Sequence, residues 1–299
     1  MPDFYPIIEV QREWVLEPEA LGSKKKFWYR QANEEQDRLF KYPEPNTGQH
    51  WAEKITAEIA AFLDIPHAQV DLAIFQGKRG STTASFVRDG QSLSHGNQIM
   101  AGHVFGYDPK VRFQQSSHTL DNIFLALDKT FLTPEDTHNA KVQFSDYLVL
   151  DAVIGNTDRH HENWGILLKQ DGNHWVGNLA PTFDHASSLG RELLDESQRK
   201  CRQRLLDEKR VGSYAEQARG AIYRDKDDRH GISPLALVRW AAELHPEIFK
   251  TALDRVERLD GAAMERIVRR VPEDWMTPLE RQFSVAFVCY SATELRRVL

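Results

Sequence analysis

The densest group of side chains that could do chemistry lies in one short segment, residues 155–163, which reads Gly155-Asn156-Thr157-Asp158-Arg159-His160-His161-Glu162-Asn163. Every residue after the glycine is polar or ionisable. The segment lies between a helix predicted over 134–154 and the apolar segment 164–168. A loop held at both ends by buried elements is rigid, and acid–base groups and metal ligands need rigid placement. Residues 155–163 are therefore the first candidate for a catalytic loop.

Two residues of this loop have the spacing of a phosphoryl-transfer site. Asp158 precedes Asn163 by the interval that separates the base from a metal-binding asparagine in the kinase loop H-R-D-x-x-x-x-N. A hairpin predicted over 166–176 then brings Asp184 beside the loop. Phosphoryl transfer needs a carboxylate that orients and deprotonates the acceptor hydroxyl, and hard oxygen ligands for Mg²⁺. We expect Asp158 as the base, and Asn163 and Asp184 as the metal ligands.

The first ninety residues offer groups that could bind ATP. Lys41 lies on a predicted strand and Glu53 on a helix predicted over 51–63, which is the order of the kinase lysine and its helical glutamate. Glu58 is an alternative partner for the lysine. A turn between two predicted strands could place backbone N–H groups and cations over phosphates, although a solvated basic turn fits the same residues equally well. The residues of this turn are Gly22, Ser23 and Lys24.

Other classes of protein compete for the same residues. The sequence contains neither a Walker A pattern nor a full G-x-G-x-x-G, which excludes P-loop and Rossmann proteins. A metal-dependent phosphohydrolase or nuclease could use the histidines of the loop, but no second His/Asp cluster of comparable density is seen in the sequence. A pseudokinase-like binding module is the third alternative, and no essential kinase group is missing. The histidines concerned are His160, His161 and His185.

The pattern of elements predicts an α+β fold with two lobes. Residues 1–90 mix strands with one helix and form a small lobe, residues 91–117 form a hinge or connector, and residues 118–299 form a larger, mainly helical lobe. Strands are predicted over 6–15, 26–30, 38–42, 70–75 and 82–87, with a turn over 77–80 between the last two. Helix starts are predicted where threonine or serine precedes proline, and Gly155 should end the first of these helices. The three starts are Thr133, Ser233 and Thr277.

Composition limits the partners and the compartment. The net charge is −6 and the isoelectric point is near 6.1, so the broad positive surface that binds nucleic acid is not expected. No apolar stretch is long enough to span a bilayer, and the first residues lack the features of a signal peptide. The two cysteines, Cys201 and Cys289, form no C-x-x-C pair, which suits a reducing compartment. We expect a cytoplasmic protein with no membrane contact and no direct contact with nucleic acid.

The same residues resemble the HipA-like serine/threonine kinases, the bacterial toxin-type kinases and their short split-system relatives. The resemblance rests on Leu21-Gly22-Ser23, Phe40-Lys41-Tyr42, Trp51-Ala52-Glu53-Lys54-Ile55, residues 155–163 and Pro181-Thr182-Phe183-Asp184. It implies a bilobal protein-kinase-like fold that uses ATP and Mg²⁺, with Asp158 as base, Asn163 and Asp184 as metal ligands, Lys41 on ATP and Glu53 as its partner. It also implies a protein acceptor, which in toxin-type relatives points to an aminoacyl-tRNA synthetase, and a toxin–antitoxin role.

Three features depart from the family pattern. Full-length members carry a further N-terminal subdomain for which this chain has no room, so a small antitoxin or accessory protein is an expected partner. The best-known members place an autophosphorylated serine before the loop glycine, whereas residues 17–21 contain none, so inactivation by phosphorylation of that loop is not expected. The order Asp158-Arg159-His160 reverses the eukaryotic His-Arg-Asp. We therefore expect Arg159 to support the loop rather than bind a phosphorylated activation loop.

Overall fold

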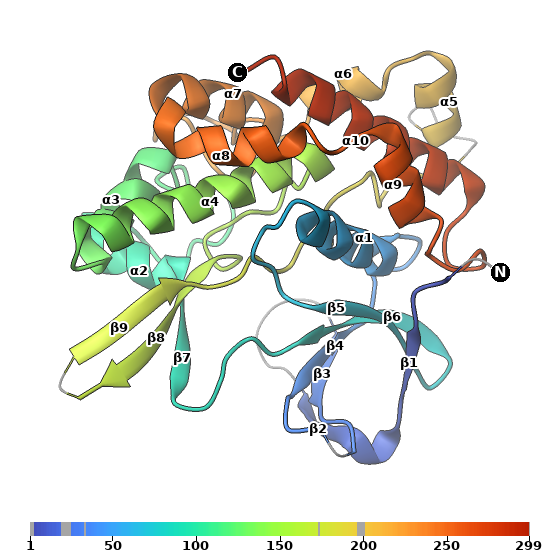
Figure 1. Cartoon of the computed structure of the whole chain (residues 1–299), viewed down its shortest axis with the longest axis horizontal. Helices are drawn as coiled ribbons and strands as arrows, with labels where there is room; N and C mark the ends of the chain where they lie inside the picture. The colour runs from blue at the N-terminus through green and yellow to red at the C-terminus, as the bar shows by residue number, and fades with distance from the viewer. Residues whose placement is uncertain (1–2, 19–24, 33, 173, 196–200, 299) are drawn as a thin grey trace.

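The chain folds into two lobes, a sheet-rich one and a helical one, which meet at helix α1 (Figure 1). The structure is a computed structural model, and it describes residues 3–18, 25–32, 34–172, 174–195 and 201–298. The fold is mixed α+β with a small lobe of one sheet and one helix and a larger, mainly helical lobe, as the sequence predicts.

A six-stranded sheet forms the small lobe. Its strands follow the spatial order β1-β5-β6-β4-β3-β2, and β1 runs parallel to β5 while the other neighbours are antiparallel. Lys41 is the last residue of β4 and faces Ser81 of β6 across the ladder. The strands are β1 (Ile7–Val10), β2 (Val15–Pro18), β3 (Lys26–Tyr29), β4 (Arg38–Lys41), β5 (Val70–Phe75) and β6 (Lys78–Ala84).

Two sequence predictions for this sheet are wrong in detail. The segment 6–15 is not one strand, because a 3₁₀ turn over Arg12–Trp14 redirects the chain, and β1 and β2 lie on opposite edges of the sheet. The β5–β6 turn is also shorter than the predicted 77–80. It consists of Gln76 and Gly77, whose φ angles of 51° and 73° allow a two-residue hairpin turn, so β6 begins at Lys78.

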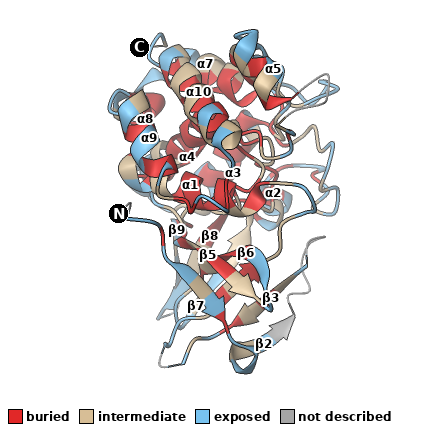
Figure 2. Cartoon of the chain, turned by 90° about the vertical axis from the view of Figure 1, so that its right-hand side faces the viewer, coloured by how far each residue is buried: buried red, intermediate tan, exposed pale blue. Residues whose placement is uncertain are grey.

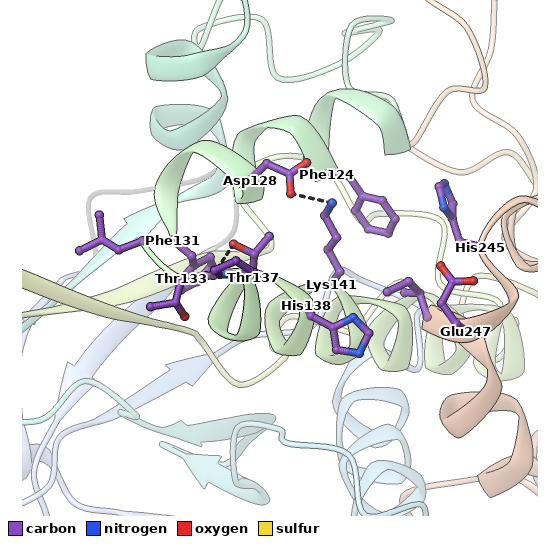
Figure 3. A pocket seen from close by; sticks show the side chains of 12 residues that line it. Phe124, Asp128, Phe131, Thr133, Thr137, His138, Lys141, His245 and Glu247 are labelled. Atoms are coloured by element: carbon purple, nitrogen blue, oxygen red, sulfur yellow. Dashed lines mark hydrogen bonds and ion pairs between the residues drawn. The ribbon is translucent and has the colours of Figure 1, made fainter.

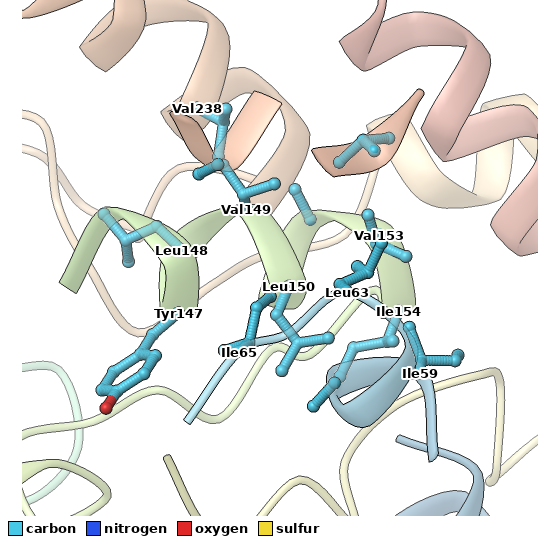
Figure 4. Packing of buried hydrophobic residues seen from close by; sticks show 14 of the residues in the cluster. Ile59, Leu63, Ile65, Tyr147, Leu148, Val149, Leu150, Val153, Ile154 and Val238 are labelled. Carbon is cyan, nitrogen blue, oxygen red and sulfur yellow. The ribbon is translucent and has the colours of Figure 1, made fainter. Parts of the chain in front are cut away.

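Helix α1 (Gln49–Phe62) belongs to the cores of both lobes. One side packs on β5 and β6, and the other packs against the helical lobe. Figure 4 shows Ile59 of α1 with Leu63 and Ile65 beside Leu150, Val153 and Ile154 of the long helix α4. These side chains are almost fully buried in one continuous apolar cluster. Glu53 is therefore held at a fixed place relative to both lobes.

The large lobe is built around α4 (Pro134–Ile154), which contacts α3, α7, α8 and α10. Figure 2 shows that the buried residues gather in this lobe and along α1. A three-stranded antiparallel sheet, in the order β7-β8-β9, flanks the helices. Its strands are β7 (Gln91–His95), β8 (Gly165–Asp171) and β9 (His174–Leu179). The other helices are α2 (Gly96–His103), α3 (Leu120–Thr130), α5 (Arg202–Asp207), α6 (Val211–Glu216), α7 (Pro234–Leu244), α8 (Pro246–Val256), α9 (Gly261–Val268) and α10 (Pro278–Leu295).

The predicted helix starts are confirmed. Thr133, Ser233 and Thr277 each accept a hydrogen bond from a backbone N–H in the first turn of α4, α7 and α10. Gly155 follows α4 with a φ of 67°, the left-handed conformation that ends the helix and turns the chain into residues 156–163. Within the described ranges, no helix is both long enough and apolar enough to cross a membrane.

Candidate active site

A buried carboxylate–guanidinium pair fixes the loop 155–163. Arg159 donates two hydrogen bonds to Asp151 of α4, from Nε to Oδ2 at 2.7 Å and from Nη2 to Oδ1 at 2.8 Å. A third donor, Nη1, reaches the carbonyl oxygen of Asn163 at 2.6 Å, and Asn156 Nδ2 donates to Asp151 Oδ1 at 2.8 Å. Both members of the ion pair are buried. Arg159 therefore supports the loop, as the sequence predicts.

The same loop orients Asp158 and Asn163. Asn163 donates from Nδ2 to the carbonyl oxygen of Asp158 at 2.7 Å, which makes Oδ1 the amide atom able to bind a cation. The backbone N–H of Asp158 donates to Asn156 Oδ1 at 3.1 Å. The Asp158 side chain is 32% exposed, so its carboxylate lies at the surface of the site, where Ser187 Oγ is 3.5 Å from Oδ2.

Lys41 and Asp184 meet between the lobes. Lys41 Nζ lies 3.1 Å from Asp184 Oδ1. Burial lowers the pKa of Lys41, but the nearby carboxylates of Asp184, Glu53 and Asp158 raise it by more, so the net shift is upward and the ammonium stays charged. Asp184 has a φ of 59°, a left-handed conformation that is strained for a residue other than glycine. The fold holds this strained backbone at the point where the carboxylate faces the lysine.

Glu53 is buried behind this pair. The backbone N–H of His185 donates to Glu53 Oε1 at 2.7 Å, and His185 Nδ1 is 3.6 Å from the same oxygen. Burial raises the pKa of Glu53, but Lys41 and the hydrogen bond from His185 lower it by more, so the carboxylate is ionised. Glu53 Oε2 has no hydrogen-bond partner among the described residues. The alternative glutamate, Glu58, pairs with Lys54 at 2.7 Å.

A series of hydrogen-bonded side chains links the loop 155–163 to buried Glu53. Thr182 Oγ1 accepts a hydrogen bond from Arg159 Nη2 at 2.9 Å and lies 2.8 Å from His185 Nε2. This series therefore runs from Asp151 through Arg159, Thr182 and His185 to Glu53. From the sequence, Asp151 could be interpreted only as a satisfied buried group, although an aspartate in an apolar helix does indicate a buried partner. No sequence signal indicated that Thr182 belongs to this series of hydrogen bonds.

The residues present fit a magnesium–nucleotide complex. Mg²⁺ is bound in proteins through one or two carboxylates together with phosphate oxygens and water. Asp184 supplies a carboxylate, Asn163 supplies an amide oxygen directed away from the loop backbone, and Lys41 supplies a charged donor for phosphate. The predicted phosphate-binding turn, Gly22, Ser23 and Lys24, lies outside the described residues.

The loop histidines are held by other side chains. Arg112 Nη2 lies 3.1 Å from His160 Nε2, and Tyr107 Oη lies 2.7 Å from His161 Nδ1. Burial, with the charge of Arg112, lowers the pKa of His160 to about 3. In the part of the chain that the structure describes, no three His, Cys, Asp or Glu side chains come together as a metal-binding group.

The helical lobe carries pockets of different sizes. The larger, about 470 Å³, lies between α3, α4 and α8 and is lined by residues such as Phe124, Lys141 and His245 (Figure 3). It contains none of the predicted site residues. A smaller pocket, about 210 Å³, is lined in part by Thr157, Asp158, His160 and His161. This smaller pocket belongs to the candidate active site.

A small sheet lobe and a larger helical lobe joined at α1 give a protein-kinase-like fold. Between the lobes lie a strand lysine, a glutamate of α1, and an Asp–Asn loop followed by a second aspartate. The family model described as HipA-like C-terminal domain matches residues 19–273. The chain belongs to this family, as the resemblance in the sequence indicated.

Solved structures give the same fold. The proinflammatory kinase CtkA of Helicobacter pylori is similar with a TM-score of 0.73 and 18% sequence identity, covering 98% of this chain and 96% of that one. HipA of Shewanella oneidensis MR-1, solved as a toxin–antitoxin complex with HipB and operator DNA, has a TM-score of 0.60 and 12% identity, covering 96% of this chain and 67% of that one. A comparison with curated protein sequences finds no match.

Proposed function

We propose that this protein is an ATP- and Mg²⁺-dependent kinase that transfers the γ-phosphoryl group to a serine or threonine hydroxyl of another protein. The observation that carries the proposal is the Lys41–Asp184 ion pair at 3.1 Å, backed by buried Glu53 and facing the loop of Asp158 and Asn163. Membership of the HipA-like family and the fold shared with CtkA support it.

Each residue has a role that follows from its chemistry. Lys41, kept charged by three carboxylates, would bind phosphate oxygens of ATP. When Asp184 binds the metal, Glu53 would balance part of the positive charge of Lys41, because Glu53 Oε2 has no other partner among the described residues. Asp158, at the surface of the pocket, would accept the hydrogen bond of the acceptor hydroxyl and then its proton.

Magnesium would be held by Asp184 Oδ and Asn163 Oδ1, and when bound it would neutralise charge on the phosphates. The chain itself contributes preorganisation. Asp151, Arg159, Thr182 and His185 hold these groups in place without touching the reacting atoms. Placing polar groups before the reaction avoids reorganising them during it, which is the main source of catalysis in phosphoryl transfer.

The remaining functional predictions are proposals of the same kind. We propose a toxin role with a small antitoxin partner, since the Shewanella HipA was solved with HipB. That complex also contains operator DNA, so the prediction of no direct nucleic-acid contact has no support from it. An aminoacyl-tRNA synthetase as acceptor, a cytoplasmic location, the lobe boundaries at 90 and 117, and the roles of Gly22, Ser23 and Lys24 stay predictions.

The proposal is tested by transfer of label from γ-labelled ATP with Mg²⁺ to proteins of a bacterial lysate, followed by mass spectrometry of the labelled species. We expect labelled serine or threonine with the native protein and none with Asp184→Ala, whose circular dichroism should be unchanged. ATP binding without transfer to any protein would instead favour the pseudokinase-like module. Metal-dependent hydrolysis of phosphate esters without a need for ATP would favour the phosphohydrolase.

A further inference from the structure

The pocket beside Asp158 has three walls from distant parts of the chain. They are residues 112–118, the catalytic loop at 157–161, and residues 220–223. Its volume of about 210 Å³ is below the 300–1,000 Å³ typical of sites that enclose a small molecule. The pocket can therefore take one or two side chains of a larger acceptor, but not a whole drug-sized alcohol.

The first wall is firmly attached to the catalytic loop. Tyr107, which is buried, bonds to His161, and Arg112 Nε forms an ion pair with Glu162 Oε2 at 3.2 Å. Gln115 Nε2 donates to the carbonyl oxygen of Asp108 at 2.8 Å, which closes the segment on itself. These contacts fix the segment 104–117 against the catalytic loop. A group bound on the segment would therefore be held at a fixed distance from Asp158.

One buried nitrogen at the pocket has no partner within the described ranges. His161 Nδ1 lies 2.7 Å from Tyr107 Oη. The other ring nitrogen, Nε2, has no hydrogen-bond partner among the described residues, although the side chain is only 1% exposed. An unpaired buried polar atom is unfavourable, and a polar backbone group of a bound chain would satisfy it.

The outer edge of the same wall is apolar and exposed. Phe113 lines the pocket and is 66% exposed, and the guanidinium of Arg112 lies 5.2 Å from the centre of its ring. Val111 beside it is also exposed. An exposed aromatic side chain at the mouth of a pocket is typical of a protein-binding site. The histidines of the pocket floor are neutral, because burial lowers the pKa of His118 to about 4 and that of His160 to about 3.

We propose that this pocket is the acceptor site, and that it selects an extended protein segment in which a large apolar residue lies within two positions of the phosphorylated serine or threonine. The hydroxyl meets Asp158, the apolar side chain packs on Phe113, and a polar backbone group of the segment pairs with His161 Nε2. This inference rests on the proposed kinase function and specifies its substrate. Phe113 is a specificity-determining residue and takes no part in the chemistry.

The test uses a positional-scanning peptide library with one fixed serine or threonine, labelled from γ-labelled ATP by the native protein and by Phe113→Ser. We expect the native protein to select leucine, isoleucine, phenylalanine or methionine near the acceptor. Phe113→Ser should lose that selection and lower kcat/KM for the best peptide by about fivefold or more, with the KM for ATP unchanged. Leu132→Ser is the matched control, since Leu132 is 84% exposed and lines the remote pocket between α3, α4 and α8. It should behave like the native protein.

Three results would overturn the inference. They are selection that does not include an apolar position, unchanged selection in Phe113→Ser, and faster labelling of free small alcohols than of any peptide. Absence of any labelled library member would also overturn it, because the proposed segment is short enough to be contained in the library. The proposed function fails separately, if Asp158→Ala still labels lysate proteins or if the native protein labels none.

Discussion

Replacing Asp151 by asparagine should destabilise the protein strongly and disable the catalytic loop. Asp151 accepts three side-chain hydrogen bonds, two from Arg159 and one from Asn156. The Arg159 side chain is only 3% exposed, so it cannot regain water when its counter-charge is removed. Breaking a buried pair in this way costs about 3–5 kcal/mol, a large part of the ~5–15 kcal/mol by which domains are stable.

Asp146→Asn is the matched control, because Asp146 lies on the same helix and is as well buried. It accepts one bond, at 2.7 Å, from Arg255, whose side chain is 28% exposed and can be rehydrated. Burial raises the pKa of Asp146, so its charged form is already disfavoured. We expect Asp146→Asn to cost no more than about 1 kcal/mol.

The assay is urea unfolding followed by tryptophan fluorescence and circular dichroism, with phosphoryl transfer measured below the transition. Asp151→Asn should unfold at clearly lower urea and lose transfer while still binding ATP. Asp146→Asn should keep both properties. Equal stability of the two variants, or full transfer by Asp151→Asn, would refute the view that this ion pair positions the loop.

Three further results are expected. Glu53→Gln should raise the KM for ATP roughly tenfold in steady-state kinetics, because Lys41 loses one of the carboxylates that keep its ammonium charged and in position. An unchanged KM for ATP would contradict this role of Glu53. The free energy of unfolding should fall as pH drops from about 6.5 towards 4, by up to about 1.4 kcal/mol per pH unit for each of His118 and His160. Both rings have folded pKa values below 6.5, so the unfolded chain takes up protons first. Urea titrations at several pH values would measure this change, and a flat profile would argue against neutral buried rings. Gly155→Ala should lower the thermal midpoint of unfolding by several degrees, because alanine disfavours the positive φ and its Cβ would clash with the ring of Phe287. An unchanged midpoint in calorimetry would contradict the left-handed cap.

Much of this architecture is predictable because local signals are strong where the chain turns. Thr133 before proline and Gly155 at the other end mark both ends of α4, and each does so by a hydrogen bond or a φ angle that few other residues can provide. The sequence predicts the β5–β6 turn over 77–80, whereas the turn consists of Gln76 and Gly77. Several residues there suit a turn, and only the pairing of the two strands decides which of them form it.

The site divides in a similar way. Asp158, Asn163 and Asp184 could be proposed from the sequence because their types and spacing match what phosphoryl transfer requires. The supporting residues Thr182 and His185 could not, since only tertiary packing brings Thr182 to Arg159 within the helical lobe and His185 to Glu53 of α1. Contacts between residues more than a hundred positions apart, such as that of His185 with Glu53, leave no periodic pattern in a sequence.

The most direct test of the central claim is single-turnover transfer from γ-labelled ATP with Mg²⁺, comparing the native protein with Asp158→Asn, which keeps the size of the side chain and removes its ability to accept a proton. ATP affinity is measured in parallel by calorimetry. The kinase account predicts equal ATP affinity and a rate of transfer lower by about a thousandfold or more in the variant. Transfer at the native rate by Asp158→Asn would contradict it.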